Sequence, residues 1–149
     1  MAYKTINPYT NEVVKEYPNA TTDDIQKALT VGHQLFKQWE ADKPENRSGQ
    51  LHEIAKLFRK HSDQLAKAMV TDMGKLYREA QGEVELCALI ADYFADHGAQ
   101  LLAPTKIETV ATGDAQIKKQ PLGILMMVEP WNFPMYQIMR VFAPNFMDW

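Results

Sequence analysis

The chain has 149 residues, of which 46% are hydrophobic and 23% are charged. These proportions are those of an ordinary globular domain and exclude a largely disordered chain. The formal net charge is only −3, and no charged block is typical of a nucleic-acid-binding protein. No stretch approaches the roughly 18 continuous apolar residues of a membrane span. We therefore expect neither a nucleic acid nor a membrane as a partner.

The single cysteine, Cys87, excludes an internal disulfide and suits a reducing compartment. Since the amino terminus contains no apolar signal segment, we expect a cytoplasmic location. Cys87 also falls on the apolar face of a predicted helix with no fixed base nearby, which favours a packed core thiol over a nucleophile. The four histidines show no metal-ligand spacing, so no metal site is expected.

The amino-terminal region is predicted to form a β-hairpin followed by a helix. Residues 3–6 and 12–17 are β-prone and are separated by turn-forming residues. The helix should begin at Thr21 or Thr22, whose hydroxyl can accept a backbone hydrogen bond, and should end at Pro44. Its apolar stripe consists of Ile25, Ala28, Leu29, Leu35, Phe36 and Trp39.

Two further helices are expected, over residues 44–73 with Gly74 as the carboxyl-terminal cap and over residues 77–102. Three helices with apolar faces predict a packed layer. The residues of the third helix expected to face inward are Ala80, Val84, Cys87, Ile90, Ala91, Phe94 and Leu101.

The carboxyl-terminal third changes from helical to strand periodicity. Residues 106–111 and 115–120 predict a second hairpin, and the continuous apolar run 123–128 predicts a strand buried on both faces, as in a parallel sheet. A helix over residues 135–143 should follow, and Pro144 should kink or end it. A parallel strand needs a crossover and a second strand. The sequence contains neither, so the chain looks cut short.

The turn Glu129-Pro130-Trp131-Asn132-Phe133-Pro134 is the strongest candidate site. The sequence contains neither a G-x-G-x-x-G motif nor a P-loop. The turn, however, lies at the carboxyl end of the predicted strand, where open α/β sheets bind ligands. An Asn132 amide held between two prolines can donate a hydrogen bond to a developing oxyanion. Alternatively, Asn132 caps the helix and Trp131 fills the core. The residues alone favour neither the oxyanion role nor this structural role.

The motif Pro130-Trp131-Asn132-Phe133-Pro134 resembles a hallmark of the aldehyde dehydrogenase superfamily. Residues 6–13 resemble the amino-terminal hairpin of that family. Residues 72–75 and the acidic helix with Glu79, Glu83 and Glu85 resemble its E-x-G-K stretch and the helix after it. Residues 120–123 resemble its R-x-P-x-G entry to the first nucleotide-binding strand. Within the superfamily, the chain is most similar to bacterial succinate-semialdehyde dehydrogenases that use NAD or NADP.

The resemblance implies an α/β fold, namely the amino-terminal portion of the aldehyde dehydrogenase fold. This portion contains a hairpin, three helices, an oligomerisation-type hairpin at residues 106–120, and the first strand and helix of a Rossmann-like nucleotide-binding domain. Residues 1–149 would then be an incomplete amino-terminal part of that domain, with the catalytic domain absent. A homo-oligomeric or aggregation-prone product is expected, since an unpaired strand exposes apolar surface.

The resemblance also implies oxidation of succinate semialdehyde, or a similar short aldehyde, to the acid with NADP or NAD. Asn132 would be the oxyanion donor, and Pro130, Trp131 and Asn132 would border the cofactor. Arg140 fits the pattern N-F-P-x-x-x-I-x-R and would bind the substrate carboxylate, for which a guanidinium is suited. The equally weighted alternative is that Arg140 is a solvent-exposed residue on the helix surface.

The same resemblance places the nucleophilic cysteine and the general-base glutamate downstream of the helix that carries Arg140. Cys87 lies too early in the chain to be that nucleophile. We therefore expect a truncated fragment that is inactive by itself. A non-catalytic binding or assembly module derived from the family is the alternative.

Overall fold

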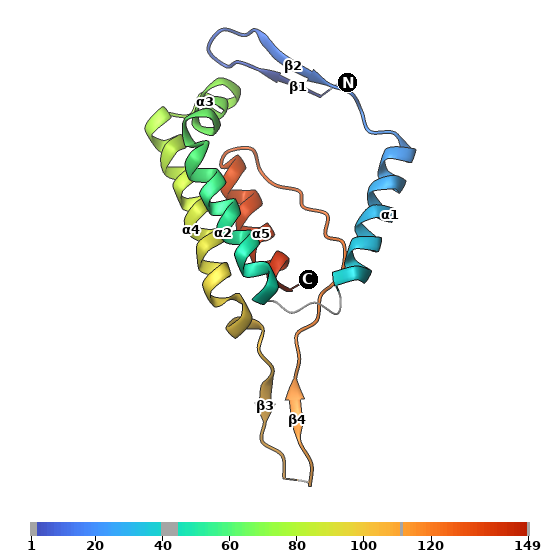
Figure 1. The fold of residues 1–149 in the computed structure, drawn as a ribbon. Helices are drawn as coiled ribbons and strands as arrows, with labels where there is room; N and C mark the ends of the chain where they lie inside the picture. Colours follow the sequence, from blue (N-terminus) through green and yellow to red (C-terminus); the bar gives the residue numbers. More distant parts are fainter. Residues whose placement is uncertain (1–2, 40–44, 111, 149) are drawn as a thin grey trace.

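The computed structural model describes residues 3–39, 45–110 and 112–148. Figure 1 shows a helical body with a β-hairpin at each end and one helix standing apart. None of the described helices has both the length and the apolar character needed to cross a bilayer. In chain order the elements are β1 (Tyr3–Ile6), β2 (Val13–Tyr17), α1 (Thr22–Trp39), α2 (Glu45–Lys60), α3 (Ser62–Met73), α4 (Tyr77–Leu102), β3 (Thr105–Ile107), β4 (Ala115–Ile117) and α5 (Pro134–Asp148).

Helix α4 forms the centre of the helical body, and α2, α3 and α5 pack against it. Small side chains dominate its buried face, so the neighbouring helices approach closely. Of the predicted inward residues, Leu101 is exposed because the helix is leaving the body there, and Leu102 packs against the core instead. The buried residues of α4 are Ala80, Glu83, Val84, Cys87, Ala88, Ala91, Ala95 and Gly98.

Residues 45–73 form two helices, whereas the sequence predicts a single helix over residues 44–73. His61 separates α2 from α3 and adopts a non-helical conformation (φ −103°, ψ 15°). The break allows both helices to lie against α4. The cap at Gly74 is confirmed: Gly74 is left-handed (φ 71°), and its N–H donates to the Val70 carbonyl at 3.0 Å.

The amino-terminal hairpin is confirmed. Strands β1 and β2 pair antiparallel, with Tyr3 opposite Tyr17 and Ile6 opposite Val13. The Asn7 carboxamide oxygen accepts the N–H of Tyr9 at 2.9 Å, which stabilises the turn between the strands.

Helix α1 has the predicted start but not the predicted burial. Thr21 Oγ1 accepts the N–H of Asp24 at 3.1 Å, and the Asp24 carboxylate accepts the N–H of Thr21 at 2.9 Å, which together form a capping box. The Thr21 N–H and the Thr21 hydroxyl, which donates to the same carboxylate at 2.7 Å, lower the pKa of Asp24. No described residue of α1 is buried, however. Pro44, its expected end, lies outside the described residues.

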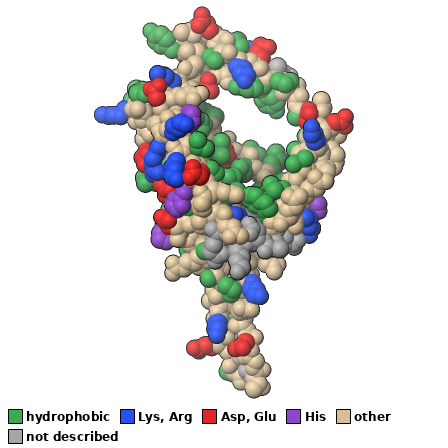
Figure 2. All heavy atoms as spheres, viewed as in Figure 1, with side chains coloured by type: hydrophobic (Ala, Val, Ile, Leu, Met, Phe, Trp, Pro, Cys, Tyr) green, Lys and Arg blue, Asp and Glu red, His purple; other side chains and the backbone are tan. Residues whose placement is uncertain are grey.

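The apolar stripe of α1 faces an opening rather than a packed layer. Figure 2 shows hydrophobic side chains around the hollow between α1 and the helical body. Only the carboxyl-terminal end of α1 reaches the body, where the Trp39 ring meets the Phe146 ring of α5 edge to face at 5.7 Å. The predicted layer of three helices is therefore wrong for the first helix, because the described residues cover only the carboxyl-terminal part of its stripe, where Leu35, Phe36 and Trp39 are half-buried.

The second hairpin is confirmed with shorter strands. β3 and β4 pair antiparallel from Thr105 opposite Ile117 to Ile107 opposite Ala115. The hairpin projects away from the helical body (Figure 1). Ala111, the expected last residue of its first strand, lies outside the described residues.

The predicted buried strand at residues 123–128 is wrong in this chain. The segment crosses from β4 to α5 without strand assignment, and the described sheets are the two separate hairpins. Met126 and Val128 are 90% and 81% exposed. A strand needs a hydrogen-bonded neighbour, and no described segment lies beside this one as a partner strand. The apolar pattern is real, but its burial depends on a partner.

Helix α5 is longer than predicted, and both of its ends are tied to the helical body. It begins at Pro134, one residue before the predicted start, and continues through Pro144 to Asp148. Arg47 of α2 is 2% exposed, and its Nη1 donates to the carbonyls of Phe146 and Met147 at 3.2 and 3.0 Å. The last turn is therefore stabilised by tertiary contacts beyond the proline, which alone would weaken the helix.

The close approach of α4 and α5 predicts opposite effects for two glycines of α4. A Cβ on Gly98 would lie 2.8 Å from Met147 Cγ, whereas a Cβ on Gly82 would meet nothing within 4 Å. We expect Gly98→Ala to lower the free energy of unfolding by about 1–3 kcal/mol. The control Gly82→Ala should raise it by about 0.5–1 kcal/mol. Urea unfolding followed by circular dichroism measures both, and equal shifts would contradict the packing described.

Candidate functional site

The predicted site turn leads into α5 at the surface of the helical body. Trp131 is 75% exposed and Asn132 is also exposed. One of the two interpretations of the sequence requires Trp131 to fill the core, and this exposure contradicts it. Together with Met69 of α3 and Met135 of α5, Trp131 lines an open cavity of about 300 Å³. The turn is accessible, and its indole presents a flat apolar surface beside a carboxamide.

The start of α5 is capped by Glu83 of α4. Glu83 Oε1 accepts the N–H groups of Met135 and Tyr136 at 2.9 and 3.1 Å. These are first-turn amides that have no partner within a helix, and a carboxylate is also favourable at the positive end of the helix dipole. Among the described residues, Asn132 makes no side-chain hydrogen bond that would cap α5. Its amide is therefore free to serve another acceptor.

Glu83 is itself held by Lys75, the residue that follows the Gly74 cap. The two side chains form an ion pair and are 1% and 6% exposed, respectively. The Lys75 ammonium also lies 3.7 Å from the centroid of the Phe133 ring. The sequence pattern places Glu83 on a helix but indicates no role for it. The available signal was an acid on the inward stripe, three residues after Ala80 and four before Cys87.

The structure places Arg140 on α5 but not against Asn132. Arg140 is exposed, while its neighbour Met139 is buried in the core. Its guanidinium carbon lies 6.0 Å from the centroid of the Tyr136 ring, one turn earlier in the helix. Arg140 and Asn132 thus share one helix and the turn before it, are both open to solvent, and lie roughly two helical turns apart.

Cys87 is a core thiol, as predicted. Its side chain is fully buried in the cluster formed by α2, α4 and α5. Burial, with a smaller contribution from the charge of Glu83, raises the pKa of Cys87 to about 12. A thiol with this pKa is protonated at neutral pH and is a poor nucleophile.

One histidine, His52, and the neighbouring charged residues form surface ion pairs. His52 Nδ1 lies 2.8 Å from Asp92, and Arg59 bridges Asp92 and Glu85 at 2.7 and 3.0 Å. Within residues 3–39, 45–110 and 112–148, no group of three or more metal-ligating side chains is arranged to hold a metal ion. These pairs join α2 to α4 along an exposed face.

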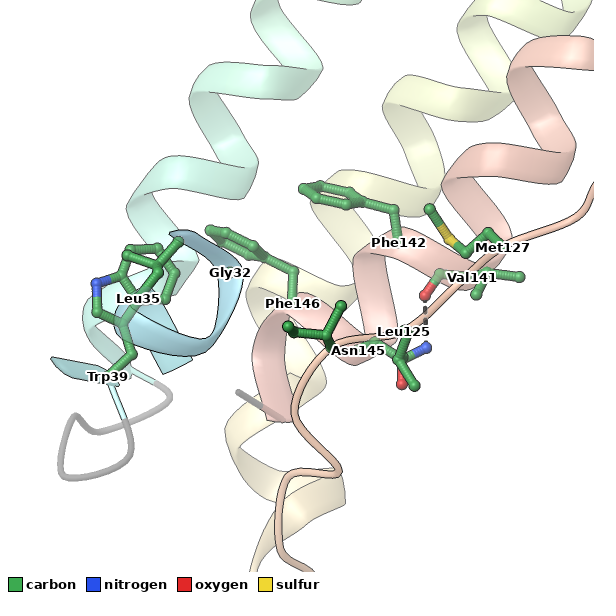
Figure 3. A pocket seen from close by; sticks show the side chains of 10 residues that line it. Gly32, Leu35, Trp39, Leu125, Met127, Val141, Phe142, Asn145 and Phe146 are labelled. Carbon is green, nitrogen blue, oxygen red and sulfur yellow. Dashed lines mark hydrogen bonds between the residues drawn. The ribbon is translucent and has the colours of Figure 1, made fainter. Parts of the chain in front are cut away.

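A second cavity, of about 290 Å³, lies where α1, residues 124–127 and α5 meet (Figure 3). Its lining is almost entirely apolar, with Trp39, Leu125 and Phe146 among its walls. The one carboxamide, Asn145, donates to the Val141 carbonyl of its own helix at 2.7 Å. This cavity therefore offers apolar surface but no group suited to acid–base or nucleophilic chemistry.

Comparison with known proteins relates the chain to one family. The profile of the aldehyde dehydrogenase family matches residues 1–147. A succinate-semialdehyde dehydrogenase (NADP+) of Deinococcus radiodurans is 38% identical over 96% of this chain, and one (NAD(P)+) of Escherichia coli is 35% identical over 94%. The crystal structure of succinic semialdehyde dehydrogenase from Streptococcus pyogenes with NADP+ superposes with a TM-score of 0.94, with 51% identity over 99% of this chain.

The chain spans only about a third of those relatives. It covers 30% of the Deinococcus and Escherichia proteins and 32% of the Streptococcus chain. The expected family resemblance, confined to an amino-terminal portion, and the expected fold class are therefore confirmed.

The raised pKa of Cys87 predicts slow alkylation and a distinct pH dependence. At about pH 8, iodoacetamide should modify the native thiol at least about 100-fold more slowly than in urea, because reaction requires opening. The unfolded thiol ionises near pH 8.5, so the free energy of unfolding should fall as pH rises from there towards 12. The Cys87→Ala variant should lack this part of the pH dependence of the unfolding free energy. Rapid native alkylation would contradict the burial.

Proposed function

Because the chain belongs to the aldehyde dehydrogenase family, we propose that it forms the amino-terminal part of an enzyme that oxidises succinate semialdehyde, or a similar short aldehyde, with NADP or NAD. The observation that carries the proposal is the exposed motif turn before α5, whose Asn132 amide has no described partner in the chain. The succinate-semialdehyde dehydrogenases among its relatives support the choice of substrate.

Asn132 is the proposed oxyanion donor. When a thiolate adds to an aldehyde carbonyl, negative charge develops on the oxygen, and a fixed carboxamide N–H can stabilise it without reorganising. The two prolines of the turn and the capped start of α5 limit the movement of Asn132. Cys87 cannot supply the thiolate, because it is buried and protonated. The nucleophile and the base are therefore assigned to parts of the enzyme outside these 149 residues.

Pro130, Trp131 and Asn132 are the proposed cofactor-bordering residues. The turn fits a flat nicotinamide ring because the Trp131 indole is exposed and lines a mainly apolar cavity with Met69, Met135 and Asp72. A nicotinamide cofactor held there would supply the hydride acceptor. In this part of the site, Pro130 and Trp131 would orient the ring, while Asn132 would hold the substrate oxygen.

Arg140 is the proposed carboxylate-binding residue. It is exposed and lies on the helix that follows the turn. A short substrate with an aldehyde at one end and a carboxylate at the other would place its aldehyde near Asn132 and its carboxylate near Arg140. A guanidinium binds a carboxylate with two parallel hydrogen bonds, which orients the substrate as well as attracting it.

A chimeric enzyme tests the proposal. Residues 1–147 joined to the remainder of the Streptococcus pyogenes enzyme should reduce NADP+ with succinate semialdehyde, whereas the 149-residue chain alone should not. In the chimera, Asn132→Ala should lower kcat by about 100- to 1,000-fold, since one oxyanion donor is lost. Asn19→Ala, at an exposed position before α1, is the matched control. A folded chimera that is inactive, or an unchanged kcat in Asn132→Ala, would contradict the proposed function.

Arg140→Gln should change the substrate preference of the chimera. We expect kcat/KM for succinate semialdehyde to fall by about 10- to 100-fold, because a charged hydrogen-bonding partner is removed. Butyraldehyde, which lacks the carboxylate, should be oxidised nearly as before. Arg78→Gln, which changes an exposed arginine of α4, serves as the control. Equal losses for both aldehydes would show that Arg140 does not bind the carboxylate.

A non-catalytic assembly module is the second candidate. The β3–β4 hairpin stands clear of the helical body (Figure 1), and Leu122, Met126 and Val128 are largely exposed. Exposed strand edges and apolar side chains favour association. Discrete oligomers of the 149-residue chain in light scattering, together with an inactive chimera, would favour this candidate over the enzymatic one.

A further inference from the structure

The ion pair between Lys75 and Glu83 lies directly beneath the turn that carries Asn132. Both side chains are almost completely buried. Burying two charges removes them from water, and the cost commonly exceeds their mutual attraction unless further hydrogen bonds are made. Glu83 meets this condition, because it also accepts two backbone amides at the start of α5. The buried pair therefore links the centre of the helical body to the turn that precedes α5.

Each member of the pair makes a second contact, and both second contacts are with the motif turn or the helix start. Glu83 Oε1 holds two consecutive backbone amides, those of Met135 and Tyr136. Lys75 holds the face of the Phe133 ring at 3.7 Å. The first of the three residues contacted in this way, Phe133, directly follows Asn132 in the chain. They fix the backbone from which the Asn132 side chain projects.

We propose that Glu83 and Lys75 are positioning residues that set the orientation of the Asn132 carboxamide by clamping the chain from Phe133 to Tyr136. The inference rests on the proposed role of Asn132. Both side chains are almost completely buried, and they contact the Phe133 ring and the Met135 and Tyr136 amides, so they act through the segment that follows Asn132 rather than on a reacting group. A small displacement of a catalytic donor costs far more in rate than in binding.

Amide exchange in the 149-residue chain tests the clamp directly. In Glu83→Gln, the Met135 and Tyr136 amides should exchange about 10- to 100-fold faster and shift in an amide-correlation spectrum, because a charged acceptor is lost. Glu85→Gln is the matched control, since Glu85 lies on the same helix and pairs with Arg59 at the surface. Uniform acceleration throughout α4 and α5 would indicate a merely structural role and overturn the proposal.

A double variant keeps the test decidable if Glu83→Gln unfolds through its unpaired lysine. Lys75→Gln combined with Glu83→Gln leaves no buried charge at this position and keeps an amide oxygen in place of the carboxylate. Faster exchange confined to Met135 and Tyr136 in the folded double variant supports the clamp. Native exchange rates at both amides overturn it.

The chimeric enzyme provides the catalytic readout. Glu83→Gln should lower kcat by about 10-fold or more while KM for succinate semialdehyde stays within about twofold, because the Arg140 contact is untouched. An active chimera whose kcat is unmoved overturns the positioning role and leaves the proposed function intact. If the unmodified chimera folds but has no activity, the proposed function fails instead, and the amide measurement still decides whether Glu83 holds the turn.

Discussion

The structure depends on two buried charges of opposite sign, one at each end of α5. Glu83 accepts the first-turn amides of this helix, and Arg47 donates to the carbonyls of Phe146 and Met147 in its last turn. Each charge matches the sign that the helix dipole favours at that end. The unsatisfied backbone groups at both ends thereby find partners on other helices. The axial position of α5 is fixed by these two contacts, and the packing of Met139 and Ala143 against α4 fixes its rotation.

This arrangement explains why the motif turn has a defined place although its own side chains are exposed. Trp131 and Asn132 contribute little to the core. The constraints come from Phe133, Met135 and Tyr136, which Lys75 and Glu83 hold from below. Local stiffness from two prolines is thus combined with anchoring by residues about fifty positions earlier in the chain. Under the proposed role of Asn132 as an oxyanion donor, this separation of the exposed side chain from its buried support would provide preorganisation.

The sequence predicts those elements whose causes are local. The hydroxyl cap at Thr21, the cap at Gly74, both hairpins and the long helix α4 follow from turn residues, caps and apolar spacing within one segment. The packing of Cys87 and its poor reactivity follow from its place on an apolar stripe. The family motif likewise identifies the turn at residues 130–134.

Features that depend on a distant partner were missed or misjudged. The run at 123–128 and the stripe of α1 have apolar patterns typical of buried segments. Whether they are buried is decided by which segments lie beside them. The continuation of α5 through Pro144 depends on Arg47, about a hundred residues away. The cap by Glu83 links α4 to α5. Its only signal in the sequence is an acidic residue on an apolar helix face.

The clamp on α5 also has a consequence for the order in which the chain acquires its structure. Helices α2, α3 and α4 are consecutive and close only short loops when they pack, whereas α5 must return across a long connection. During synthesis the first three helices therefore emerge and can associate while Glu83 and Arg47 are still hydrated. Both charges lose their water in a single event, when α5 arrives and brings its two ends at once. Docking of the last helix is thus an all-or-none step, and a nascent chain that stops before residue 134 would keep both charges in solvent and remain loosely packed.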